Sequence, residues 1–140
     1  MRLLTALSAI EHHELVLHGV EARTVKELAN ALGLPYERVV EALGLALATI
    51  NRKRARDLVL SPSESDPVVG LARLVSLVQS WPVSEAVAPE GFRAGAWLGA
   101  WLTTPNPALG DRLPLDLLET SVGRDMVERL LGSVASGTYW

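Results

Sequence analysis

The residues best suited to metal chemistry lie together near the N-terminus, in the segment EHHELVLH (Glu11–His18). A zinc protease motif needs two histidines four residues apart, so that both face one side of a helix. His13 lies five residues before His18 and His12 lies six before it, which turns the pairs by about 140° and about 120° on a helix. No third group of ligands accompanies them. The spacing favours a polar helix face, and we expect no metal site.

Nucleophilic and acid–base chemistry finds equally little support. The segment GSVASG (Gly132–Gly137) places serine between glycines but lacks the strand–turn–helix setting of a nucleophile elbow. The C-terminal carboxylates are spaced like charges on helix surfaces: Asp111, Asp116, Glu119, Asp125 and Glu128. There is no phosphate-binding glycine loop and no cysteine. We therefore expect no catalytic residue and no cofactor, and a binding protein rather than an enzyme; an enzyme that uses the N-terminal histidines is the most remote alternative.

One segment has residue types that suit nucleic acid. YERVVEALGLALATINRKRAR (Tyr36–Arg56) predicts two helices around Gly44, the arrangement of a helix-turn-helix. On the second helix, Thr49, Arg52 and Arg56 fall within about 60° of one another. Lys53 and Arg54 flank this basic face, and the opposite face is predicted to be apolar, with Ala46, Leu47, Ile50 and Leu58.

A recognition helix reads base edges with its early residues and holds phosphates with Lys and Arg. We expect Arg52, Lys53 and Arg56 to meet phosphates, while Thr49 and Asn51 approach base edges. Asparagine can pair with adenine through two hydrogen bonds, so Asn51 could specify sequence. A solvated basic helix face is the alternative interpretation.

A second helix-turn-helix register overlaps the first. VKELANALGLPYERVVEAL (Val25–Leu43) has Ala29, Gly33 and Val39 at the typical spacing. Its second helix would present Glu37, Arg38 and Glu41 to DNA. Two carboxylates would repel phosphates, so the later register is preferred.

Helical spacing recurs along the whole chain and is interrupted by Gly, Pro and Ser, so the predicted fold class is all-α. The expected helices cover residues 3–18, 24–32, 36–43, 46–57, 65–80, 91–102, 114–119 and 121–135. Leu60–Pro67 reads as a polar connector in which Ser63 and Asp66 cap the next helix. That helix carries a broad apolar face, expected to be buried between the halves: Val68, Leu71, Ala72, Leu74, Val75 and Val78.

The N-terminal and C-terminal parts of the 140-residue chain differ in net charge. Residues 1–60 hold eight Lys and Arg against seven Asp and Glu, whereas residues 61–140 hold five against nine. The net charge of −3 argues against a general nucleic-acid binder, and the asymmetry suggests halves with different partners. We predict a helix-turn-helix region over residues 1–64 and a small helical binding domain over 65–140.

The expected location is the cytoplasm. The N-terminal MRLLTALSAI has no small-residue cleavage site and meets a charge at Glu11, which argues against a signal peptide. No stretch approaches the roughly 20 apolar residues that span a bilayer, so no membrane partner is expected. The absence of cysteine fits a reducing compartment.

The C-terminal half combines a proline-rich corner, an amphipathic helix and an aromatic end. In WLTTPNPALGDRLPLDLLET (Trp101–Thr120), Pro105 and Pro107 stop one helix and Pro114 suits the first turn of another. Residues 121–136 then carry a stripe of Val122, Met126, Val127, Leu130, Leu131 and Val134, predicted to pack on the chain's own core. Gly137 suits a helix C-cap, and Tyr139 and Trp140 suit an interface anchor, with packing on the chain's own core as the alternative.

This half resembles the C-terminal domain of the Xre/MbcA/ParS-type antitoxins. The family pattern runs W-L, P-N-x-A-L-G, P-L-x-L-L-x-T, then G-x-x-x-V-x-x-x-L and a Gly-aromatic tail. It is carried here by Trp101-Leu102, Pro105-Asn106, Ala108-Leu109-Gly110, Pro114-Leu115, Leu117-Leu118, Thr120, Gly123, Val127, Leu131 and Gly137. The N-terminal half is similar more loosely, through Thr49 and the Leu60–Asp66 connector. Where the family often has glycine, this chain has Asp111, and its Asp57–Ser61 replaces a Gly-Arg-Leu-Ser connector.

The resemblance implies a type II toxin–antitoxin pair. The N-terminal half would bind operator DNA as a homodimer and repress its own operon. The C-terminal half would hold a RES-domain toxin, an NAD-degrading enzyme, inactive, with Tyr139 and Trp140 plugging its active-site cleft. Residues implied in toxin binding are Trp101, Pro105, Asn106, Leu109, Gly110, Pro114, Leu115, Leu118, Thr120, Tyr139 and Trp140. The alternative is a stand-alone helix-turn-helix regulator whose C-terminal half only dimerises.

Overall fold

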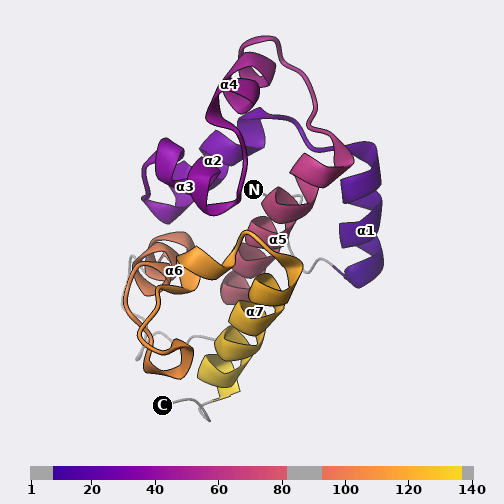
Figure 1. Cartoon of the computed structure of the whole chain (residues 1–140). Coiled ribbons are helices and arrows are strands. Elements are labelled where there is room, and N and C mark those ends of the chain that lie inside the picture. Colours follow the sequence, from indigo (N-terminus) through magenta and orange to yellow (C-terminus); the bar gives the residue numbers. More distant parts are fainter. Residues whose placement is uncertain (1–7, 82–92, 137–140) are drawn as a thin grey trace.

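The computed structural model describes residues 8–81 and 93–136, and in these ranges the chain is helical with two isolated β-bridges (Figure 1). The all-α prediction is confirmed. The α-helices are α1 (Ala9–His18), α2 (Arg23–Leu32), α3 (Tyr36–Ala42), α4 (Leu47–Ala55), α5 (Pro62–Gln79), α6 (Ala94–Leu102) and α7 (Ser121–Ser136). Two 3-10 helices, η2 (Pro107–Leu109) and η3 (Pro114–Leu117), lie between α6 and α7.

Two helices start at capping boxes that the sequence interpretation missed. Ser8 caps α1 together with Glu11, so α1 begins at Ala9, while residues 3–7 of the expected helix lie outside the described residues. Ser61 caps α5 together with Glu64, and Pro62 occupies its first position. Ser63 and Asp66, predicted as caps, therefore lie inside α5. The physical reason is that a capping box places Glu three residues after the cap, which only Ser61 satisfies here.

The long helix α5 is the centre of the molecule. It packs against α1, α2, α6 and α7, and Figure 1 shows it running between the N-terminal helices and the C-terminal ones. The burial predicted for its apolar face is confirmed, since Val68, Leu71, Ala72, Leu74, Val75 and Val78 are each at most 2% exposed.

The two halves of the chain share one hydrophobic core. Buried residues of the N-terminal helices, such as Leu28 and Ile50, belong to the same cluster as Leu98, Leu115 and Leu131. The boundary expected between residues 64 and 65 falls within α5, which contributes to both sides. The division into two binding regions stays a prediction about function, while the packing is continuous.

The proline-rich segment is an ordered corner. The Asn106 amide oxygen accepts from the Ala108 backbone N–H at 2.9 Å, and its backbone bridges to Arg112. The helix expected over 114–119 is a 3-10 helix ending at Leu117. Asp111, where the resembled family often has glycine, has a φ of +65°, and Asp57, in the segment that replaces the Gly-Arg-Leu-Ser connector, has a φ of +56°. Aspartate tolerates this left-handed region better than most residues, so both turns persist without glycine.

Within the described ranges, no helix is both long enough and apolar enough to cross a membrane.

Candidate functional site

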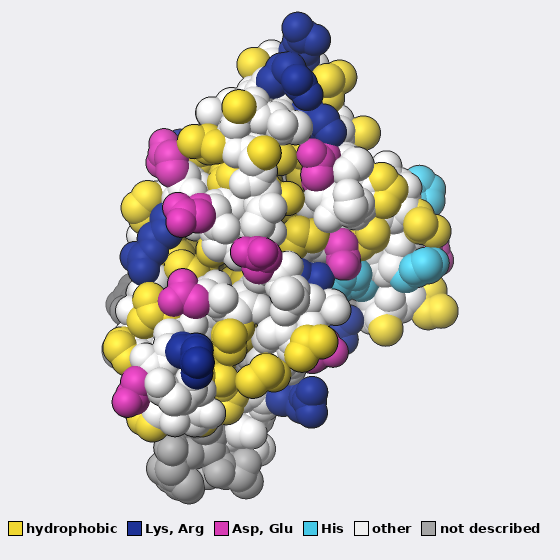
Figure 2. All heavy atoms as spheres, in the orientation of Figure 1, with side chains coloured by type: hydrophobic (Ala, Val, Ile, Leu, Met, Phe, Trp, Pro, Cys, Tyr) yellow, Lys and Arg dark blue, Asp and Glu magenta, His cyan; other side chains and the backbone are white. Residues whose placement is uncertain are grey.

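The basic helix α4 lies at one end of the molecule, where Figure 2 shows Lys and Arg side chains gathered at the top. Asn51, Arg52 and Arg56 are exposed, while Thr49 is half-buried. The predicted apolar back is mostly wrong: only Ile50 is buried, and Leu47 and Leu58 are 38% and 44% exposed. α4 ends at Ala55, so Leu58 lies beyond it. The exposed cations nevertheless project from one terminal surface.

Lys53 has an internal partner. Its Nζ lies 2.6 Å from Glu64 Oε1, and both side chains are about one-fifth exposed. Burial would raise the pKa of Glu64, but hydrogen bonds from Lys53 and Ser61 outweigh it and lower that pKa below the ordinary value. Glu64 thus caps α5 and ties α4 to it. The ion pair makes Lys53 a positioning residue for α4 in the free protein.

Arg54 is also engaged inside the molecule. Its guanidinium lies 4.6 Å from the centre of the Tyr36 ring, and Lys26 lies 5.3 Å from it. Burial raises the pKa of the Tyr36 hydroxyl. These cation–π contacts join α2, α3 and α4 and hold the outward faces of α4 in place.

Both predicted pairs of helices, α2 with α3 and α3 with α4, are joined by a turn at a glycine. Gly33 (φ +70°) turns α2 into α3, and Gly44 (φ +71°) turns α3 into α4. The difference is chemical: α3 exposes Glu37, Arg38 and Glu41, whereas α4 exposes Arg52 and is followed by the exposed C-cap residue Arg56. Electrostatics therefore favours α4 as the helix that meets phosphate.

The corner brings the residues implied in toxin binding together but turns half of them inward. Buried are Asn106, Leu109, Pro114, Leu115 and Leu118. Pro105, Gly110 and Thr120 are exposed, and Trp101 is half-buried against Trp97 with ring centres 6.3 Å apart. Tyr139 and Trp140 lie outside the described residues. The buried members pack within the chain, and their part in toxin binding stays a prediction.

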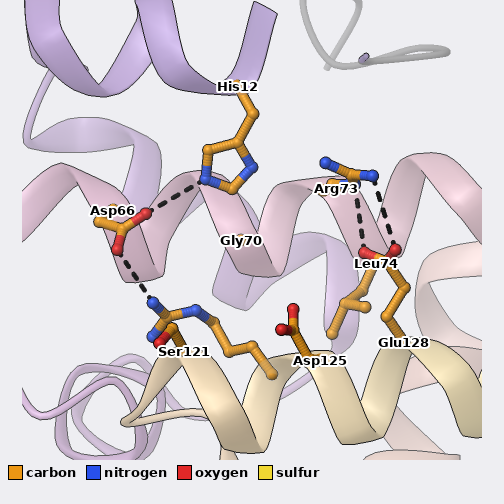
Figure 3. A pocket seen from close by; sticks show the side chains of 9 residues that line it. His12, Asp66, Gly70, Arg73, Leu74, Ser121, Asp125 and Glu128 are labelled. Carbon is orange, nitrogen blue, oxygen red and sulfur yellow. Dashed lines mark hydrogen bonds and ion pairs between the residues drawn. The ribbon is translucent and has the colours of Figure 1, made fainter. Parts of the chain in front are cut away.

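The N-terminal histidines take part in helix contacts. His12 Nε2 lies 3.2 Å from Asp66 Oδ1, and the other Asp66 oxygen lies 3.0 Å from Arg124 (Figure 3). His18 Nδ1 lies 2.8 Å from the Glu14 carbonyl oxygen. The described part of the chain contains no cluster of three or more metal-ligating side chains.

Figure 3 shows the cavity around these ion pairs, between α1, α5 and α7. Its volume is about 210 Å³, and Arg73 pairs across it with Glu128 at 3.1 Å. The Arg124 side chain also lines the cavity and is only 11% exposed. The pairs join α7 to α5 and α5 to α1, so the cavity is a structural junction between the halves.

Comparison with known proteins agrees with this arrangement of the surfaces. Residues 11–73 match the antitoxin Xre-like helix-turn-helix domain, and residues 90–137 match the antitoxin Xre/MbcA/ParS C-terminal toxin-binding domain. The two matched regions carry the basic helix and the corner with α7, respectively.

Two curated relatives carry antitoxin names. A "Prs ADP-ribosylating antitoxin" of Sphingobium sp. (strain YBL2) is 37% identical over 132 residues, covering 94% of this chain and 82% of the relative. An "Antitoxin Xre" of Yersinia enterocolitica serotype O:8 / biotype 1B (strain NCTC 13174 / 8081) is 30% identical over 106 residues, covering 76% of this chain and 66% of the relative. The chain belongs to the Xre/MbcA/ParS antitoxin family. It is an antitoxin with a helix-turn-helix domain and a toxin-binding domain.

Proposed function

We propose that this antitoxin neutralises a RES-domain toxin by direct binding and represses its own operon as a DNA-bound homodimer. The observation that carries the proposal is the coincidence of two surfaces with two matched domains: exposed cations on α4, and the corner with α7. The name of the Sphingobium relative refers to ADP-ribosylation, a reaction that takes its ADP-ribosyl group from NAD. This supports a partner toxin that consumes NAD.

On the DNA side, Arg52 and Arg56 are the phosphate contacts of this proposal, with Thr49 and Asn51 toward base edges. Lys53 would join them only by leaving Glu64. The Arg52→Ala/Arg56→Ala variant should bind operator at least about tenfold more weakly, and its salt slope should flatten by about two, because each lost phosphate contact removes about one. Titration of operator DNA at several salt concentrations measures both quantities.

The Arg38→Ala variant is the matched control, because Arg38 is an exposed cation on the rival helix α3. Its operator affinity should stay within about threefold of the wild type, since one solvated surface charge contributes little. A larger loss for Arg38→Ala than for the double variant would assign recognition to α3. Unchanged affinity in the double variant would contradict recognition by α4.

On the toxin side, Tyr139 and Trp140 are proposed to plug the toxin's active-site cleft. Deleting Thr138–Trp140 should leave operator binding intact and reduce neutralisation about tenfold or more, because aromatic anchors dominate interface energetics. The measurement is NAD consumption by a RES-domain toxin of the same genome at increasing antitoxin concentration. Equal neutralisation by the truncated and full-length chains would rule out the plug. Operator binding without any toxin binding would instead favour a stand-alone regulator.

A further inference from the structure

The helix α7 has more apolar surface than the rest of the molecule covers. Its sequence stripe was expected to pack inward, but the structure divides it. Val127 and Leu131 are fully buried, whereas Val122 and Met126 are 68% and 41% exposed. Residues four apart lie on one face of a helix, so Val122, Met126 and half-buried Leu130 form a second apolar face beside the buried one.

A shallow groove of about 280 Å³ adjoins this face, between α7 and η2. Its lining is Ala108, Leu109, Met126, Arg129, Leu130 and Ser133. Arg129 is exposed and supplies the one positive charge of that lining. Figure 2 shows hydrophobic side chains grouped over the part of the molecule where α7 lies in Figure 1. We call the six residues that line the groove, together with Val122, the α7 face.

The domain match indicates the occupant of the α7 face. Among residues 93–136, the large hydrophobic side chains that are exposed are Val122 and Met126, and both fall inside the toxin-binding match. Of the corner, Ala108 and Leu109 line the groove, whereas Pro114, Leu115 and Leu118 are buried. α7 is followed closely in sequence by Tyr139 and Trp140, the residues proposed above to contact the toxin.

We propose that the α7 face is the main docking surface for the toxin, with Met126 at its centre and Arg129 at its rim. The proposal rests on the toxin-binding function proposed above and adds the contact surface. The matching toxin surface presents an apolar side chain for the groove and a carboxylate for Arg129. An exposed apolar centre with a charged rim is the usual anatomy of such an interface.

The test is the affinity of Met126→Glu for a purified RES-domain toxin of the same genome, with unfolding and operator binding measured alongside. The dissociation constant should rise at least about tenfold, because a carboxylate would be desolvated in an apolar contact. Leu17→Glu is the control, since Leu17 is 59% exposed on α1, and its toxin affinity should equal that of the wild type. The milder Met126→Ala should give a smaller loss.

Each outcome decides between the proposals. If the wild type does not bind the toxin, the proposed function fails and the docking surface fails with it. If the wild type binds and Met126→Glu binds equally well, the docking surface alone is wrong. If Met126→Glu keeps its toxin affinity but converts a dimer to a monomer in sedimentation, the α7 face is an interface between two copies of this chain, which also overturns the proposal.

Discussion

Replacing Gly99 by alanine is expected to lower the free energy of unfolding by about 3 kcal/mol, the upper end of ordinary overpacking costs. A Cβ at Gly99 would lie 1.9 Å from the Leu32 carbonyl oxygen and 2.9 Å from its carbon. A Cβ at Gly95, one turn earlier, would lie 2.4 Å from the Ala31 carbonyl oxygen. These are backbone atoms that cannot rotate away, so α6 would have to move off α2.

Chemical denaturation followed by circular dichroism measures the effect, with a Tm about 10 °C lower as its thermal counterpart. Gly132→Ala is the matched control, because a Cβ there meets nothing within 4 Å on helix α7. That variant should be stabilised by up to about 1 kcal/mol, the ordinary gain of alanine over glycine in a helix. A Gly99→Ala protein as stable as the wild type would mean that α2 and α6 do not approach so closely.

The contact at Gly99 also joins the two matched domains, since α2 belongs to the helix-turn-helix match and α6 to the toxin-binding match. Loss of close packing there would weaken the shared core as a whole. We therefore expect Gly99→Ala to unfold in one transition at lower denaturant, without leaving a separately stable half.

The second large effect is expected at Arg124, where Arg124→Met should cost about 2 kcal/mol. The guanidinium donates to the Leu118 carbonyl oxygen at 2.9 Å and pairs with Asp66 at 3.0 Å. Methionine keeps most of the side-chain packing over Gly70 but leaves these acceptors without their donor. The cost stays below that of a fully buried pair because the Asp66 side chain is 45% exposed to water.

Two comparisons isolate this contribution in denaturation experiments. Arg129→Met, an exposed site on the same helix, should change stability by less than about 0.5 kcal/mol. Asp66→Asn keeps an acceptor and should cost less than Arg124→Met, and the double variant should cost less than the sum of the two. Additive costs would show that the ion pair adds nothing to the attachment of α7 to α5.

The class of fold could be predicted because its signals are local. Helical periodicity and the Gly and Pro interruptions depend on residues within one or two turns, so the α-helices of residues 8–81 and 93–136 lie close to their expected positions. The capping boxes at Ser8 and Ser61 were equally readable from the S-x-x-E spacing. Ser63 and Asp66 lie within α5 because the S-x-x-E spacing makes Ser61 its cap. The residue pattern also carried the family resemblance, and with it the expectation of two binding regions.

The partners of the charged side chains were decided by the tertiary structure. No local sequence pattern predicts that Lys53 pairs with Glu64. Arg124 pairs with Asp66, which lies 58 positions earlier, because the packing of α7 on α5 brings the two side chains together. The sequence predicted Lys53 to contact phosphate and identified no partner for it within the chain. A helix face identifies which side chains point the same way, but not what the rest of the chain places opposite them.

The same limit explains α7. The sequence of α7 determined an apolar stripe wider than the part that α5 and η3 cover. Helical geometry determined that Val122 and Met126 lie beside Val127 and Leu131. Only the packing of α5 and η3 decided which half is covered, because burial depends on the neighbours that long-range folding supplies. The exposed half of the stripe is the proposed docking surface. The buried corner residues that match the family pattern support α7.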